Sequence, residues 1–270
     1  MIGRIVHPTD LSELSASAFF HALRLAVSAQ CELDLLHVKL HREHDHWGSF
    51  PHVREFLVRW GIMDAEDAPS DIPAKTGIAV RKVEIDHRDG PAAGVFSYIA
   101  QHPAGLIVTA PHEHSALERW ASGSVSQLIA RKTHRPTLFM GERMKPFVDA
   151  DSGALSIQTV LVPIDHHPNP SRVINHLTHL LASFDIAPEY QLLHIGNDIP
   201  EVVNSDGQKV PVTQAVGPIV QAILDYAEEC NADLVAMPTA GHNGFLDILR
   251  GSTTERVMRA SRCPLLAIPA

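Results

Sequence analysis

The stretch Ile5-Val-His-Pro-Thr-Asp10 returns in the second half of the chain as Val160-Leu-Val-Pro-Ile-Asp165. Both copies are short apolar segments that end in Pro-x-Asp. Leu-Leu-His-Val at 35–38 likewise returns as Leu-Leu-His-Ile at 192–195. The later matches, in the same order, are Gly90-Pro91 with Gly217-Pro218, Gly123-Ser124 with Gly251-Ser252, and Arg135-Pro136 with Cys263-Pro264. Such an ordered set of repeats indicates two copies of one domain.

The repeats predict a first domain over residues 1–142 and a second over residues 157–270. The polar stretch Met144–Ser156 is expected to link them. The first domain carries extra sequence after its second strand, over residues 41–80. Within that insert, Val53–Trp60 has a helix-like pattern, and a histidine-rich run precedes it.

Each half alternates short apolar strands with amphipathic helices. In the second half we expect strands at 159–163, 190–195, 210–216, 233–237 and 264–268, and helices at 171–184, 218–231 and 252–261. Near-continuous apolar strands separated by helices indicate a parallel sheet that is covered on both faces. We therefore predict an α/β fold of two tandem Rossmann-like domains, each a five-stranded parallel sheet with helices on both faces.

The apolar strand ending in Pro-x-Asp, the Leu-Leu-His strand and a fourth strand followed by a Gly-Ser pair together resemble the universal stress protein family in its tandem, two-domain form. The resemblance implies the adenine nucleotide alpha hydrolase-like fold, the strand order 3-2-1-4-5 and a regulatory role in the stress response. It also implies a pseudo-dimer of the two domains through the closing strands near Thr137–Met140 and Leu265–Ile268. A further homodimer of the whole chain stays open.

Nucleotide-binding members of that family share a Gly-x2-Gly-x9-Gly-Ser/Thr loop after strand four. The second half has Pro238-Thr-Ala-Gly241, nine residues, then Gly251-Ser252, and departs from the pattern only at Pro238. Glycine lets the backbone approach a phosphate closely, and the amino end of a helix favours an anion. The segment Ser252–Glu255 is also a capping box, which explains the same Gly-Ser pair structurally.

We therefore expect the second domain to bind ATP, ADP or AMP, with Asp165 bonding the adenine or the ribose. The resemblance places Ile195 against the adenine. The expected nucleotide-binding residues are Pro163, Asp165, Ile195, Met237, Pro238, Gly241, Gly251, Ser252, Thr253 and Thr254.

The first half departs further from the family loop. Its aligned residues are Ala110-Pro-His-Glu113, and the carboxylate of Glu113 would repel a polyphosphate. Trp120 either fills the phosphate space or packs. Asp10 is retained, so an uncharged or adenosine-like ligand stays open. We expect this domain to be mainly structural or adapted to another ligand.

Histidine is unusually abundant, at 18 of 270 residues. The candidate zinc ligands are His44 and His46 in the insert and His112 and His114 in the altered loop, because imidazole suits that metal. The alternative function is thus a nucleotide-free interaction or zinc-binding protein. His37 and His194 hold matched strand positions and are expected to be buried with their hydrogen bonds satisfied. His166 and His167 are expected in an exposed loop that borders the second crevice.

Composition narrows the function classes. A net charge of −9 disfavours nucleic acid as a partner. No apolar run reaches the length of a membrane helix, and no signal peptide is evident. Three cysteines without a CxxC pair favour a reducing cytoplasm over a disulfide framework. The chain has no Walker A loop, nucleophile elbow or HExxH helix, so we expect a binding module with at most slow ATPase activity.

Overall fold

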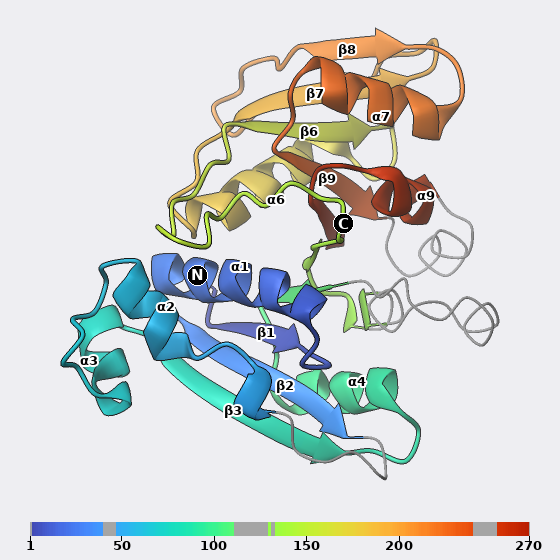
Figure 1. The fold of residues 1–270 in the computed structure, drawn as a ribbon. Coiled ribbons are helices and arrows are strands. Elements are labelled where there is room, and N and C mark those ends of the chain that lie inside the picture. The colour runs from blue at the N-terminus through green and yellow to red at the C-terminus, as the bar shows by residue number, and fades with distance from the viewer. Residues whose placement is uncertain (1, 40–46, 111–128, 131–132, 240–252, 270) are drawn as a thin grey trace. The chain divides into compact units, whose positions relative to one another are not determined.

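The computed structural model describes residues 2–39, 47–110, 129–130, 133–239 and 253–269 (Figure 1). The chain divides into two compact units. Unit 1 comprises Met1–Glu142 with Pro146–Ser156, and unit 2 comprises Arg143–Lys145 with Ile157–Ala270. No helix in the described ranges combines the length and apolar character needed to cross a membrane.

Unit 1 is built on a five-stranded parallel sheet in the order β3-β2-β1-β4-β5. The strands are β1 (Arg4–Pro8), β2 (Glu32–Lys39), β3 (Ala79–Asp86), β4 (Leu106–Thr109) and β5 (Thr137–Phe139). The helices are α1 (Glu13–Ala29), α2 (Val53–Arg59), α3 (Ile72–Thr76) and α4 (Pro91–Gln101), with short 3-10 turns η1 (Trp47–Ser49) and η2 (Pro69–Asp71).

Successive residues of β1 face opposite sides of this sheet. Val6 packs in a buried cluster with Val95 and Ile99 of α4. The next residue, His7, contacts Phe19 of α1 instead, with ring centroids 6.5 Å apart. Helices α1 and α4 therefore cover opposite faces of the sheet, as the doubly wound prediction requires.

Unit 2 repeats the sheet in the order β8-β7-β6-β9-β10. Its strands are β6 (Thr159–Ile164), β7 (Glu189–Ile195), β8 (Val212–Ala215), β9 (Leu234–Thr239) and β10 (Leu265–Pro269). Its helices are α6 (Pro170–Ala182), α7 (Ile219–Glu229) and α9 (Thr253–Ala260). Both units thus confirm the predicted strand order 3-2-1-4-5.

The described part of the insert packs on α1. Phe50 is 1% exposed and meets Phe19 edge-on, with ring centroids 5.1 Å apart. Phe56 of α2 contacts the rings of both Phe19 and Phe20. The helix predicted over Val53–Trp60 is therefore confirmed as α2, and its aromatic side chains extend the core of unit 1.

Residues Pro146–Ser156, called the strap below, belong to unit 1 and do not form a free polar linker. Phe147 and Val148 are buried, at 3% and 1% exposed. The guanidinium of Arg24 donates from Nε to the carbonyl of Gly153 over 2.8 Å. The indole of Trp60 donates to the carbonyl of Ala150 over 3.0 Å. Contacts from α1 and from the residue that ends α2 thus fix most of the expected linker in place.

His21 of α1 is the buried anchor of the strap. Its Nδ1 donates to the carbonyl of Ser17 over 2.7 Å. Its Nε2 accepts from the backbone N–H groups of Phe147 and Val148, each over 3.2 Å. An imidazole can accept at Nε2 only when that nitrogen carries no proton. Burial accordingly lowers the pKa of His21 to about 4, so the strap is held by a neutral histidine.

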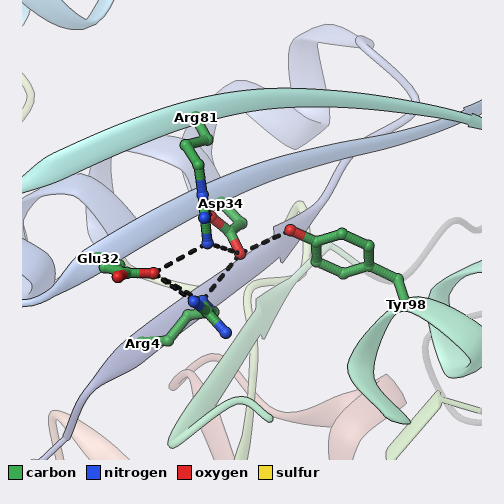
Figure 2. A network of polar contacts seen from close by, with 5 residues as sticks. All are labelled: Arg4, Glu32, Asp34, Arg81 and Tyr98. Atoms are coloured by element: carbon green, nitrogen blue, oxygen red, sulfur yellow. Dashed lines mark hydrogen bonds and ion pairs between the residues drawn. The ribbon is translucent and has the colours of Figure 1, made fainter. Parts of the chain in front are cut away.

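A buried ionic network joins β1, β2 and β3 toward their amino ends (Figure 2). Asp34 is fully buried, and its carboxylate lies 3.1 Å from Nε of Arg4 and 2.8 Å from Nε of Arg81. The hydroxyl of Tyr98 donates to the same carboxylate over 2.8 Å. Glu32 pairs with both arginines. Both carboxylate oxygens of Asp34 therefore have donors, which offsets the cost of burying its charge.

Candidate functional site

The strand order in each unit reverses next to its first strand, which lies between the second and fourth. In open α/β sheets, ligands bind outside the carboxyl ends of the strands at such a reversal. In unit 2 this point lies between β6 and β9, whose paired residues include Val160 with Leu234. Asp165 directly follows β6, and Thr239 ends β9. The predicted residue Asp165 therefore lies at the strand-order reversal of unit 2, where a ligand crevice is expected.

The carboxylate of Asp165 is open to solvent. Its side chain is 72% exposed, and Oδ1 accepts the backbone N–H of His166 over 2.8 Å. The same oxygen lies 4.0 Å from Nδ1 of His194. The second oxygen has no partner within the described part of the chain. It is free to accept a hydrogen bond from a ligand.

His194 shapes the end of the neighbouring strand β7. It is 5% exposed, and its Nδ1 donates to the carbonyl of Ile164 over 3.2 Å. His37 makes the same contact in unit 1, where Nδ1 donates to the carbonyl of Thr9 over 3.0 Å. The prediction of buried, hydrogen-bonded histidines at these matched positions is confirmed. A side chain at Gly196 would place its Cβ 2.7 Å from Nε2 of His194, so only glycine fits there without displacing the ring.

His166 and His167 are exposed, as expected, but His166 has a fixed orientation. Its Nε2 donates to the carbonyl of Asp198, in the loop after β7, over 2.9 Å. Its ring meets that of His194 at 75°, with centroids 5.9 Å apart. Sequence reasoning placed His166 in a loop and missed this bridge, because Asp198 lies far along the chain and shares no motif with it.

The other described residues of the predicted nucleotide set fall at different depths. Pro163 is buried within β6, and Met237 is 5% exposed within β9. Ile195 ends β7 and is partly buried. Pro238 lies inside β9 and pairs with Ile268, so the strand continues through the position where the family has glycine. Asp165 and Ile195 thus lie at adjacent strand ends, while Pro163 and Met237 lie in the core beneath.

Helix α9 begins at Thr253, immediately after the predicted Gly-Ser pair. Thr253 is partly exposed, whereas Thr254 is 3% exposed and faces the core. Gly241, Gly251 and Ser252 lie outside the described residues. The four predicted zinc ligands, His44, His46, His112 and His114, also lie outside them. Over the ranges that the structure describes, no three His, Cys, Asp or Glu side chains converge to hold a metal.

Unit 1 has a different arrangement after its first strand. Nδ1 of His7 donates to the carbonyl of Val108 over 2.8 Å, and Nε2 lies 3.4 Å from Oγ of Ser15. Ser15 in turn donates to Oγ1 of Thr9 over 2.7 Å. Burial lowers the pKa of His7 to about 4. The chain of hydrogen bonds is internal, so these groups stabilise the strand end. They do not present chemistry to a ligand.

Asp10, the counterpart of Asp165, caps its own loop. Its Oδ1 accepts the backbone N–H of Ser12 over 3.1 Å. Leu11 between them has a φ of 65°, a left-handed conformation that is uncommon for a branched residue. The two matched aspartates therefore follow matched strands but enter different local structures.

Comparison with known proteins agrees with this architecture. A model of the universal stress protein family matches residues 1–140 and 186–269. A curated universal stress protein of Methanocaldococcus jannaschii is 37% identical over 62 residues, which is 23% of this chain and 36% of that protein. The match therefore spans little more than a third of that relative's length.

Two solved structures cover nearly the whole chain. A universal stress protein from Archaeoglobus fulgidus aligns with a TM-score of 0.65 and 21% identity, over 98% of this chain and 96% of that one. A functionally unknown protein from Pseudomonas aeruginosa PAO1 aligns with a TM-score of 0.63 and 14% identity, over 99% of this chain and 92% of that one. These likenesses show a shared Rossmann-like, adenine nucleotide alpha hydrolase-like fold. Together with the family match over both halves, they establish that the chain belongs to the universal stress protein family, in its tandem form.

Proposed function

We propose that this protein binds ATP or another adenine nucleotide in the crevice of unit 2 and acts as a regulatory binding module. The observation that carries the proposal is the open carboxylate of Asp165, 72% exposed where the strand order reverses. A carboxylate accepts hydrogen bonds from the exocyclic amine of adenine or from a ribose hydroxyl. Ile195 ends the strand paired with β6, which supports an apolar contact with the base.

The phosphates are expected at the amino end of α9. The spacing from Gly241 to Gly251-Ser252 supports a phosphate-binding loop, and α9 begins at the next residue. The free N–H groups at a helix start and the helix dipole both favour an anion. Because Thr253 is partly exposed and Thr254 is buried, Thr253 is the better placed of the two hydroxyls to bond a phosphate.

Unit 1 is proposed to leave nucleotide binding to unit 2. The loop after β4 carries Glu113 where the family has glycine, and a carboxylate there repels phosphates. This feature favours a structural role for unit 1.

The test is native mass spectrometry of the purified chain, followed by calorimetric titration with ATP, ADP and AMP. We expect one adenine nucleotide per chain. Asp165→Ala should weaken binding about tenfold or more, because a hydrogen bond to a charged group is lost. Asp10→Ala, the matched change in unit 1, should leave the affinity unchanged.

Three results would contradict the proposal. A chain that ignores all three nucleotides rejects nucleotide binding. A loss of affinity on Asp10→Ala alone would place the site in unit 1. Stoichiometric zinc without nucleotide would favour the alternative function through His44, His46, His112 and His114.

A further inference from the structure

The side chain of His166 bridges the segments that follow β6 and β7, next to the strand-order reversal of unit 2. It follows Asp165 at the end of β6 and reaches the loop after β7, where Nε2 lies 2.9 Å from the carbonyl oxygen of Asp198. A carbonyl only accepts hydrogen bonds, so Nε2 carries the proton and donates it. The side chain is 45% exposed, and this bond fixes its orientation. A half-exposed aromatic ring with a fixed orientation thus follows the exposed carboxylate of Asp165.

The surroundings of this ring are polar on one side and aromatic on the other. The carboxylate of Asp198 lies 3.5 Å from Nε2, and that of Asp165 accepts the backbone N–H of His166. The ring of His194 meets it at 75° with centroids 5.9 Å apart. His194 is itself fixed by its bond to the carbonyl of Ile164. Each of the two imidazoles is therefore oriented by a hydrogen bond to a backbone carbonyl, at the ends of β6 and β7.

In unit 1 an aromatic ring also meets the histidine of the second strand, but it comes from the insert and not from the residue after the first strand. There the indole of Trp47, in η1, meets His37 at 79° with centroids 6.3 Å apart. The ammonium group of Lys82 lies over the Trp47 ring, 5.0 Å from its centroid. The aromatic neighbour of the strand-two histidine is thus engaged by the protein's own cation in unit 1, whereas the ring of His166 is half exposed.

We propose that the imidazole of His166 packs against the base of the bound nucleotide and so makes the unit 2 site selective for ligands with a heteroaromatic base. The inference rests on the proposed function of this crevice. Asp165 would bond the edge of the base, and His166 would contact its π surface. Stacking of a base on an aromatic side chain is sequence tolerant and strengthens binding substantially. Because the bond to Asp198 already orders the ring, little conformational freedom is lost on binding.

The test compares three variants of the full chain by calorimetric titration with AMP and ATP. His166→Ala removes the ring and should weaken both ligands about tenfold. His166→Gln retains a donor for Asp198 without an aromatic ring and should lose as much. His166→Phe retains a ring without the donor and should stay within about threefold of the unchanged chain. His176→Ala, at an exposed position on α6, is the matched control and should change nothing.

The outcomes distinguish the stacking role of His166 from the proposed nucleotide binding. If the unchanged chain binds AMP but His166→Ala binds it equally well, the stacking role is wrong and the proposed function stands. If His166→Gln binds as tightly as the unchanged chain and His166→Phe does not, His166 positions the Asp198 loop and does not contact the base. If the unchanged chain binds neither nucleotide, the proposed function itself is rejected. Thermal unfolding of each variant checks that the fold is retained.

Discussion

In each unit a helix tyrosine donates a hydrogen bond to the second strand near its amino end, but the acceptor differs between the two units. Tyr98 of α4 and Tyr226 of α7 occupy the same place in helices of 11 residues. Tyr98 donates to the buried, charged Asp34 over 2.8 Å. Tyr226 donates over 3.2 Å to the amide of Gln191, which holds the strand position of Asp34. One copy of the fold uses an ionic network where the other uses a neutral hydrogen bond.

The two units also differ at the carboxyl ends of their strands, in how far the polar side chains there are exposed. In unit 1 the side chains that follow β1 bond to one another, and the insert adds buried aromatic residues such as Phe50. In unit 2 the side chains of Asp165 and His166 are 72% and 45% exposed. Among the described residues, the buried bond from Ser15 to Thr9 belongs to unit 1, and the half-exposed imidazole that follows the first strand, His166, belongs to unit 2. We therefore expect changes in unit 1 to act on stability and changes at the unit 2 crevice to act on ligand binding.

The largest expected effect is the loss of stability on removing Asp34, compared with removing Gln191 from the matching position in unit 2. Asp34→Ala leaves two guanidinium groups and the hydroxyl of Tyr98 without their shared acceptor and should cost about 3–5 kcal/mol of unfolding free energy. Gln191→Ala, the matched change in unit 2, should cost about 1 kcal/mol, because its partners are the hydroxyl of Tyr226 and the solvent-exposed carboxylate of Glu189. The three tryptophans of the chain all belong to unit 1, so urea unfolding followed by tryptophan fluorescence reports on that unit.

Hydrogen exchange of peptides from β7 and α7 measures the loss of stability that Gln191→Ala causes in unit 2. Equal losses for the two variants would contradict the comparison, since they would mean that the ionic network of unit 1 is no stronger than its neutral counterpart.

Acid should act strongly on unit 1 through the buried histidines His7 and His21. The pKa of His7 and of His21 falls from 6.5 to about 4 because of burial. Between those values the unfolded chain binds the proton and the folded chain does not, so the unfolding free energy decreases as the pH falls from about 6.5 to about 4. Each histidine should account for about 3 kcal/mol over that window.

His21→Gln isolates the contribution of the strap. Glutamine does not titrate, and its side-chain oxygen still accepts the strap N–H groups. The variant should therefore show a flatter decrease of stability between pH 6.5 and pH 4, measured by urea unfolding at several pH values. An unchanged slope would show that His21 is not the titrating group.

The strap offers a third contrast, between two glycines with left-handed backbone. Gly153 has a φ of +69°, and a Cβ there would lie 2.6 Å from Cδ2 of Trp60. Gly207 of unit 2 has a φ of +77° with open space around it. Gly153→Ala should thus cost about 2 kcal/mol from strain and overlap, and Gly207→Ala about 1 kcal/mol from strain alone.

Faster hydrogen exchange at Phe147 and Val148 in Gly153→Ala would show release of the strap. Unchanged exchange at these two amides would mean that the strap is retained by His21 and Arg24 without a close fit at Trp60.

Apolar periodicity is a local signal and predicted the strands and helices of the second half, while the family resemblance supplied the strand order. Helix α2 and the histidines at matched strand positions, His37 and His194, could be predicted from local patterns as well. The strap could not, because its polar residues suggested a linker and the surface that buries Phe147 lies on distant helices. The Asp34 network had a weak signal, a lone aspartate in an apolar strand, but its arginine partners come from two other strands.

The candidate site was predicted only in part. Asp165 and Ile195 follow from strand ends and a family resemblance, and the structure places them at the ends of the adjacent strands β6 and β7. The bridge from His166 to Asp198 depends on how two loops pack, which no motif encodes. Gly241, Gly251 and Ser252 stay predictions.

The smallest effect tests whether the charge of Asp34, and not the tyrosine, distinguishes the two networks. Tyr98→Phe removes a donor to a buried carboxylate and should cost about 2 kcal/mol, the range for hydrogen bonds to charged groups. Tyr226→Phe removes contacts with Gln191 and Thr213 near the surface and should cost less than about 1 kcal/mol. Both losses are measured by hydrogen exchange in α4 and α7. If Tyr226→Phe cost as much as Tyr98→Phe, the shared helix position would determine the stability, and the charge of Asp34 would be incidental to it.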